Sequence, residues 1–336
     1  DDEKTGVGAG CDNPWCGRLC EVCTRSVAVN DLQGVWWDFE IAGVPIRKER
    51  PRPYEPHGHR QVCTDLRCRR AFADYAGLAG VPTVEQIMGD EYYERWNDFK
   101  CWQHARVWEL MAQAARRANP DADFRIYSGL PGPYTRQAYG VDWTIGARAI
   151  DVAMSVHTGR NLEQFARAHQ DASRAGGGNA KLLMSVSVNG YDLGEHITCW
   201  CARPSLPNQL LQTVVDWDCV GFALCGVWGF DSQFNACVRQ AAAVFADYED
   251  ILTTGTHDDA LLQVAPADLA YAAWSSADGR RLVGFFFNNS DDAVDVRIAR
   301  TDTWATVVEG HDVVATDDGI TLTIGPWAHR IVELRK

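Results

Sequence analysis

From residue 34 to 230 the chain alternates short apolar runs with longer amphipathic stretches. Apolar residues recur at helical spacing in residues 91–119, which Pro120 ends, and again in residues 235–252. Strands that alternate with helices in this way are typical of a parallel sheet. We therefore predict an α/β fold built on part of a (β/α)8 TIM-type barrel. The runs expected as buried strands are residues 34–40, 124–128, 151–156, 181–188 and 221–228.

The pattern changes after residue 255. Residues 282–287, 293–298 and 320–324 are short apolar runs separated by Asn, Asp and Gly turns, which predicts an antiparallel β-sandwich. We therefore divide the chain into three regions: a Cys-rich segment (1–33), a barrel portion (34–255) and a β-sandwich domain (256–336).

The barrel portion has too few strands, because a closed barrel needs eight. Either another chain supplies the first βα units, the given chain being part of a longer precursor, or the sheet is open.

Carboxylates stand at the end of the first expected strand, where barrel enzymes place their working groups. Alternation puts Asp38 and Glu40 on one side and Phe39 on the other. Two neighbouring carboxylates repel each other, which raises the pKa of one and prepares it as a general acid. We therefore predict a catalytic or ligand-contacting role for Glu40. The alternative is that one carboxylate pairs with an Arg and holds the barrel together.

Aromatic and polar residues follow the other strand ends. Sugars have apolar ring faces and a rim of hydroxyls, so their sites combine stacking aromatic rings with carboxylates and amides. Carbohydrate is therefore the expected ligand. For His157 a structural role is an equal alternative. The residues expected to bind substrate are Trp37, Asp38, Tyr127, Asp142, Trp143, His157, Asn189 and Trp228.

Twelve cysteines in 336 residues predict a secreted or cell-surface protein with disulfide bonds. The alternative is a zinc site, because Cys20 and Cys23 form a Cys-x-x-Cys motif. The triplet that begins at Asn288 is an N-glycosylation acceptor.

A net charge of -13 disfavours nucleic acids and anionic membranes as partners, and no apolar run is long enough to span a bilayer. If the protein is exported, we expect its leader to have been removed.

Three stretches resemble the middle of TIM-barrel glycoside hydrolases related to the family 42 β-galactosidases. They are residues 37–40 (WDFE), 62–72 (VCTDLRCRRAF) and 96–99 (WNDF), and the long helix closes on Pro120-Asp121 as in that family. Residues 226–250 resemble a final βα unit that leads into a β-sandwich. The resemblance implies a glycosidase with its proton donor at Glu40.

The chain departs from the family pattern at two points. Phe39-Glu40 replaces the Asn-Glu pair, and residues 181–188 contain no Glu where retaining enzymes hold their nucleophile. Glu195 is then the nearest candidate nucleophile, followed by Asp231.

We predict a secreted glycoside hydrolase, and the alternative is a non-catalytic carbohydrate-binding or structural extracellular protein. The missing nucleophile favours the alternative. No cofactor and no catalytic metal are expected. The expected partners besides carbohydrate are a second chain that supplies the first strands, or further copies of this chain.

Overall fold

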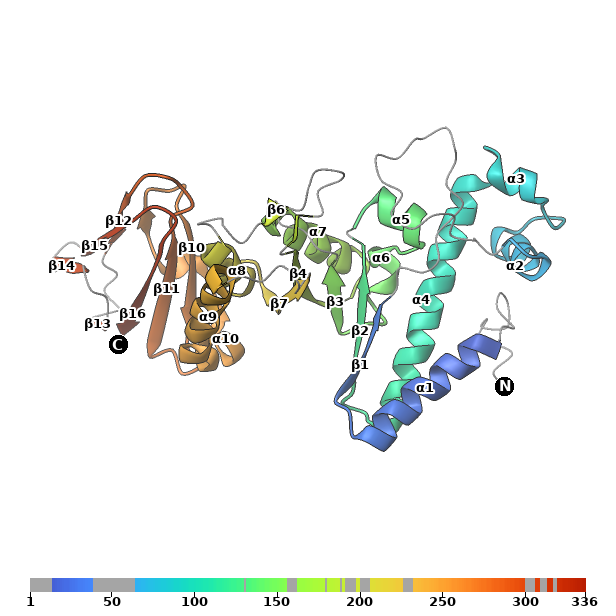
Figure 1. Cartoon of the computed structure of the whole chain (residues 1–336), viewed down its shortest axis with the longest axis horizontal. Helices are drawn as coiled ribbons and strands as arrows, with labels where there is room; N and C mark the ends of the chain where they lie inside the picture. The colour runs from blue at the N-terminus through green and yellow to red at the C-terminus, as the bar shows by residue number, and fades with distance from the viewer. Residues whose placement is uncertain are drawn as a thin grey trace. The chain divides into compact units, whose positions relative to one another are not determined.

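A computed structural model of the chain describes residues 14–38, 64–129, 131–155, 162–178, 180–187, 189–190, 198–199, 206–225, 232–299, 306–308, 313–316 and 319–336. The chain divides into two compact units, residues 1–186 with 191–196 and residues 187–190 with 197–336 (Figure 1). The predicted boundaries at residues 33 and 255 stay a prediction.

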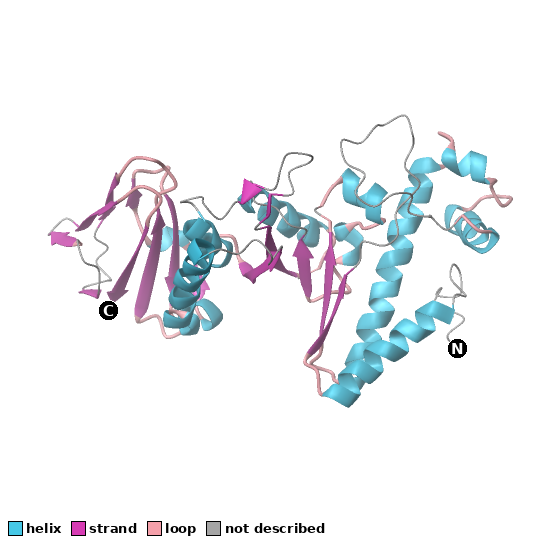
Figure 2. Cartoon of the chain, viewed as in Figure 1, coloured by secondary structure: helices cyan, strands magenta, loops and turns pink. Residues whose placement is uncertain are grey.

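The first unit alternates helices and strands (Figure 2). Its strands are β1 (Gly34–Asp38), β2 (Asp123–Ser128), β3 (Val152–Ser155) and β4 (Lys181–Ser187). Its helices are α1 (Pro14–Asn30), α2 (Leu66–Ala76), α3 (Val84–Met88), α4 (Tyr93–Ala118), α5 (Pro133–Tyr139), α6 (Trp143–Gly146) and α7 (Leu162–Ala175). The predicted strands and the long helix over residues 91–119 are confirmed.

Strands β1 to β4 lie side by side, in that order, and are parallel. This confirms the predicted α/β class. The strands described in this unit form an open row and no closed barrel, so the eight-stranded barrel stays a prediction. Helix α4 runs beside the sheet and buries Trp96, Trp108 and Met111 completely (Figure 1).

Helix α1 was not predicted, because its sequence is rich in Cys and was assigned to an irregular segment. It packs along α4, where the Thr24 hydroxyl donates to the Ala114 carbonyl oxygen at 3.0 Å. Val27 of α1 joins Ala115 and Ala122 in a small buried cluster on which Val35 of β1 rests. The two helices therefore cover one face of β1.

The second unit begins with short strands and three helices and ends in antiparallel strands. Its helices are α8 (Leu206–Val215), α9 (Ser232–Asp247) and α10 (Glu249–Thr254), with a 3-10 turn at Asp259–Leu261. Its strands are β5 (Asn189–Gly190), β6 (Thr198–Cys199), β7 (Cys219–Cys225), β8 (Thr256–His257), β9 (Val264–Ala265), β10 (Ala270–Ser275), β11 (Arg281–Phe287), β12 (Val294–Ala299), β13 (Thr306–Val308), β14 (Val314–Thr316), β15 (Gly319–Ile324) and β16 (His329–Arg335).

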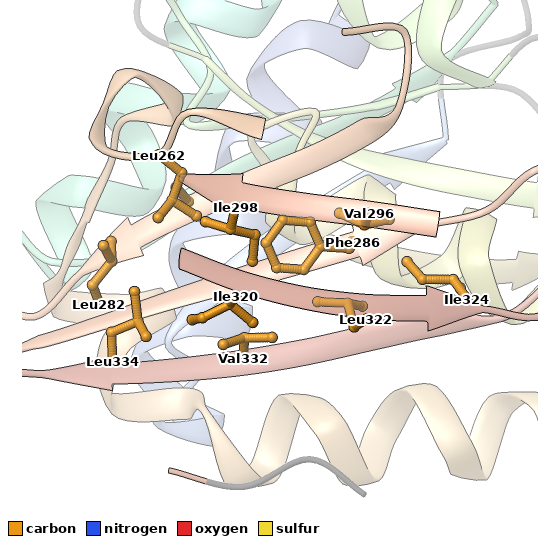
Figure 3. Packing of buried hydrophobic residues seen from close by; sticks show 11 residues of the cluster. Leu262, Leu282, Phe286, Val296, Ile298, Ile320, Leu322, Ile324, Val332 and Leu334 are labelled. Atoms are coloured by element: carbon orange, nitrogen blue, oxygen red, sulfur yellow. The ribbon is translucent and has the colours of Figure 1, made fainter. Parts of the chain in front are cut away.

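Two antiparallel sheets face each other in this unit. Their strand orders are β13-β16-β11-β10-β8 and β14-β15-β12-β9. Figure 3 shows side chains of both sheets pointing into the space between them, with Phe286 of one sheet beside Val296 and Ile298 of the other. This confirms the predicted β-sandwich.

Strand β11 is buried on both faces. Phe286 points into the sandwich core, whereas its neighbour Phe285 meets the ring of Tyr248, which lies between α9 and α10, at 5.5 Å. The Trp274 indole on the adjacent strand donates to the carbonyl oxygen of Val215 in α8 at 2.7 Å. Helices thus cover the outer face of this sheet, which explains why β11 is a continuous apolar run.

Two buried asparagines connect α8 with the turns of the sandwich. The amide nitrogen of Asn208 lies 3.0 Å from the Asn288 carbonyl oxygen and 3.2 Å from that of Ala328. The amide nitrogen of Asn288 contacts the carbonyl oxygens of Asp292, Ile324 and Gly325 at 2.7 to 3.1 Å. In the folded protein the glycosylation acceptor Asn288 is therefore 2% exposed, and its nitrogen is already hydrogen-bonded.

We predict that Asn208→Ala lowers the free energy of unfolding of the second unit by about 1–3 kcal/mol, because buried carbonyl groups lose their donor. Urea unfolding followed by tryptophan fluorescence measures this change. Asn30→Ala is the control, since Asn30 is exposed and donates to Ser26 at 3.1 Å near the end of α1. Equal unfolding midpoints for the two variants would contradict the prediction.

Candidate functional site

The parallel sheet has one covered face and one open face near β1. Val35 packs against the cluster formed by α1 and α4. Because side chains alternate along a strand, Trp36 and Asp38 point to the opposite face. Both are exposed, and the Trp36 side chain is 56% exposed. We call this side of β1 and β2 the open face.

The exposed Trp36 indole, the buried ring of Tyr127, which is 6% exposed, and the Asp38 carboxylate lie on the same side of β1 and β2. The rings of Trp36 and Tyr127 meet edge to face, with their centroids 6.3 Å apart. Asp38 is the register partner of Tyr127, so the two residues lie side by side at the carboxyl ends of β1 and β2. The predicted pair Asp38 and Tyr127 is therefore brought together.

The open face becomes apolar along the next strands. Tyr127 is the register partner of Met154 on β3, which in turn pairs with Leu183 on β4. In the neighbouring row Arg125 lies beside Trp36 and forms an ion pair with Asp123 at 2.7 Å. Aromatic and apolar groups next to a carboxylate can stack on a sugar ring and bind its hydroxyls.

Trp36 was missed by the sequence reasoning, which selected Trp37 instead. Trp37 is partly buried and shares the helix side of β1 with Val35. The same alternation that groups Asp38 with Glu40 also groups Trp36 with them, so the sequence contained the signal. The exposed aromatic ring of this strand is Trp36.

Asp142 and Trp143 hold the loop after β2 in place. Asp142 caps α6 by accepting from the Thr144 backbone N–H at 2.9 Å, and it forms an ion pair with Arg136 at 3.2 Å. The Trp143 indole is buried and donates to the Gly129 carbonyl oxygen at 2.8 Å. Both side chains have structural partners here, and their substrate-binding role stays a prediction.

Behind Trp143 lies the buried side chain of His169 on α7. Its ring contacts that of Trp143 edge to face, with the centroids 4.9 Å apart. Burial lowers the pKa of His169 to about 3, so the ring is neutral at physiological pH. Its Nε2 and the Ser173 hydroxyl one turn later are buried without a hydrogen-bond partner. The neutral, buried ring of His169 packs between α6 and α7 and carries no charge at physiological pH.

Only one of the remaining predicted site residues, Asn189, lies within the described part of the chain. Asn189 forms strand β5 with Gly190 and pairs with Cys199 in the second unit. Outside the described residues lie Glu40, His157, Glu195, Trp228 and Asp231. Their roles stay predictions.

Four of the described cysteines, Cys20, Cys23, Cys101 and Cys219, are free thiols, and no disulfide is present in the described part of the chain. Burial raises the pKa of Cys101 and of Cys219 to about 12, which keeps both protonated. The predicted disulfides are thus not found at these positions. Among the described residues, no group of His, Cys, Asp and Glu could hold a metal ion, and no helix is long and apolar enough to cross a membrane.

A histidine between two carboxylates, not anticipated from sequence, lies in the second unit. His257 Nδ1 is 3.0 Å from Asp218, its Nε2 is 3.0 Å from Asp259, and its ring stacks on Trp274. The hydrogen bonds to Asp218 and Asp259 raise the pKa of His257 to about 10. At neutral pH the cationic ring of His257 therefore forms an ion pair with Asp218, the residue before β7, and links it to the sandwich.

The comparisons with known proteins identify no family. No family model matches the chain, and no curated protein sequence matches it. Solved structures similar to it include a noncanonic maltogenic α-amylase from Thermotoga neapolitana, with a TM-score of 0.46 and 10% identity over 97% of this chain and 66% of that one. An α-amylase from Geobacillus thermoleovorans has a TM-score of 0.48 and 12% identity over 96% of this chain and 81% of that one.

A further similar structure is a family 44 xyloglucanase from Paenibacillus polymyxa, with a TM-score of 0.46 and 11% identity over 70% of this chain and 61% of that one. The chain spans less than two thirds of the length of the maltogenic amylase and of the xyloglucanase. These similar structures are glycoside hydrolases, but with TM-scores below 0.5 they carry no argument about activity. The family 42 resemblance stays a prediction.

We predict that the contribution of His257 to stability is complete below its unfolded pKa of 6.5 and is lost as the pH rises towards about 10. The folded state holds this proton more tightly than the unfolded chain, so stability falls across that window. Urea unfolding at pH 6 and pH 9.5 should show a larger loss for the native chain than for His257→Gln. Equal losses in both proteins would refute the prediction.

Proposed function

We propose that the chain is a secreted glycoside hydrolase that cleaves O-glycosidic bonds by carboxylate acid/base chemistry. The observation that supports this proposal most is the open face, where the Trp36–Tyr127 pair lies beside Asp38 at the carboxyl ends of β1 and β2. A sugar ring can stack on the exposed indole while Asp38 accepts hydrogen bonds from its hydroxyls.

Glu40 is the proposed proton donor. It follows Asp38 by two residues in the sequence, so the charge of Asp38 would favour the protonated form of a neighbouring carboxyl. Glu195 or Asp231 is the proposed second carboxylate. A separation of about 5 Å between the two carboxyl groups corresponds to a retaining mechanism, and about 6.5 to 9.5 Å to an inverting one.

A non-catalytic carbohydrate-binding protein is the second candidate function. The residues that end β1, β2, β3 and β4 are Asp38, Ser128, Ser155 and Ser187, so these described strand ends offer one carboxylate. Glycoside hydrolysis needs two. Sugar binding needs only the aromatic pair with polar groups near it. In both candidates the partner is a carbohydrate, and the proposed protein partner is an additional chain or a second copy that completes the sheet beyond β1.

We predict that Glu40→Gln lowers kcat/KM for aryl glycosides by about 100-fold or more, because positioned general acids contribute roughly 10²- to 10⁴-fold. Hydrolysis of a panel of nitrophenyl glycosides measures this loss. Glu21→Gln is the matched control, since Glu21 is an exposed residue on α1.

If the Glu40→Gln variant keeps full activity, Glu40 is not the proton donor. If the native chain binds sugars but hydrolyses none of the glycosides, the binding function replaces the hydrolase. Trp36→Ala then tests the open face directly, because loss of the exposed indole should weaken sugar binding at least about tenfold.

A further inference from the structure

An aromatic group lies on the helices α2 and α4, in a part of the first unit that the proposed function does not use. The ring of Tyr75 on α2 lies 5.4 Å from Trp102 and 5.4 Å from Phe99, both on α4, between ring centroids. Phe99 is buried, whereas Tyr75 is 44% exposed and Trp102 is partly exposed. Tyr75 and Trp102 therefore form a small exposed platform.

The platform rests on a rigid base. Phe99 contacts Phe72 at 5.6 Å and Trp96 at 5.4 Å between ring centroids, and all three rings are fully buried. The ammonium group of Lys100 lies 4.9 Å over the ring of Trp96 and is thereby held in place. Because the base is packed, the two exposed rings are positioned before any ligand arrives, which lowers the entropy cost of binding.

Charged groups that are already paired border the platform. Asp98 precedes Trp102 by one helical turn and so shares its side of α4. Its carboxylate accepts a hydrogen bond from the Arg136 guanidinium, which also contacts Asp142 at 3.2 Å. Burial raises the pKa of Tyr75, and the charge of Asp98 raises it further.

This border leads back to the proposed sugar site. Asp142 lies between α5 and α6, in the connection that joins β2, the strand that carries Tyr127, to β3. The contacts from Asp98 through Arg136 to Asp142 thus connect the platform with the segment that follows the carboxyl end of the sheet. A ligand that extends along this path would be larger than one sugar ring.

We propose that Tyr75 and Trp102 form a second carbohydrate-binding subsite, which takes one ring of a neutral oligosaccharide or polysaccharide. The inference rests on the proposed function and specifies its substrate class as a glycan of several residues. The two aromatic faces stack on the apolar face of a sugar ring, while Asp98 and Arg136 supply an acceptor and donors for its hydroxyls. A paired, mixed-sign border suits an uncharged ligand better than an anionic one.

Affinity gel electrophoresis with soluble starch, xyloglucan, arabinoxylan and β-galactan tests the subsite on the full chain. We expect one of these glycans to retard the native protein, and Trp102→Ala and Tyr75→Ala to raise its dissociation constant at least tenfold. Tyr75→Phe keeps the ring and should retain most of the affinity. Leu66→Ala is the matched control, since Leu66 is an exposed apolar residue of α2 that is 46% exposed.

Thermal melts and near-ultraviolet circular dichroism establish that each variant is folded, and Tyr75→Ala serves if Trp102→Ala is unstable. Weakening by the platform variants but not by Leu66→Ala supports the subsite, even if no glycan is hydrolysed. If Trp36→Ala weakens binding and the platform variants do not, the subsite is refuted while the proposed function stands. If none of the glycans retards the native chain, the subsite is refuted, and hydrolysis of the nitrophenyl glycosides decides the proposed function separately.

Discussion

The burial of one face of strand β1 is the constraint on which the first unit depends. Val35 rests on the cluster that α1 and α4 bury, so alternation leaves Trp36 and Asp38 on the other side. A single exposed apolar residue is common on protein surfaces, so the indole gains its interest from its edge-to-face contact with Tyr127 beside Asp38. The position of the proposed sugar site is therefore a consequence of how the helices pack.

The second unit illustrates the opposite arrangement. Strand β11 is covered on both sides, by the second sheet through Phe286 and by the helical segment through Phe285. Its polar residues are confined to its ends: Asn288 follows the strand, its side chain donates to the Ile324 carbonyl oxygen, and its own carbonyl oxygen accepts from Asn208 of α8. A strand buried in this way can position other elements but offers no surface for a ligand. Strand β11 is therefore structural, whereas β1, with one exposed face, can contribute residues to a binding site.

The sequence predicted the elements with a clear apolar period, because such a period follows directly from burial. The strands at residues 34–40 and 181–188 and the helix over 91–119 are examples. Helix α1 was missed, since its cysteines were interpreted as disulfide partners or zinc ligands, whereas Cys23 is a buried free thiol within a helix. The glycosylation triplet at Asn288 could not be judged from sequence, because two of the carbonyl groups that bind its side chain, those of Ile324 and Gly325, lie 36 and 37 residues away in the chain.

The candidate site was predictable in type but not in detail. Alternation placed Asp38 at a strand end, and the register of the strands puts it beside Tyr127, but the choice between Trp36 and Trp37 depended on which side the helices cover. The link from Asp142 through Arg136 to Asp98 involves three separate segments and has no sequence signature. In this link Asp142 acts as a connector, and its predicted substrate-binding role stays a prediction. If sugar binds on the open face, this connector makes the helical platform the natural place for the next rings of the glycan.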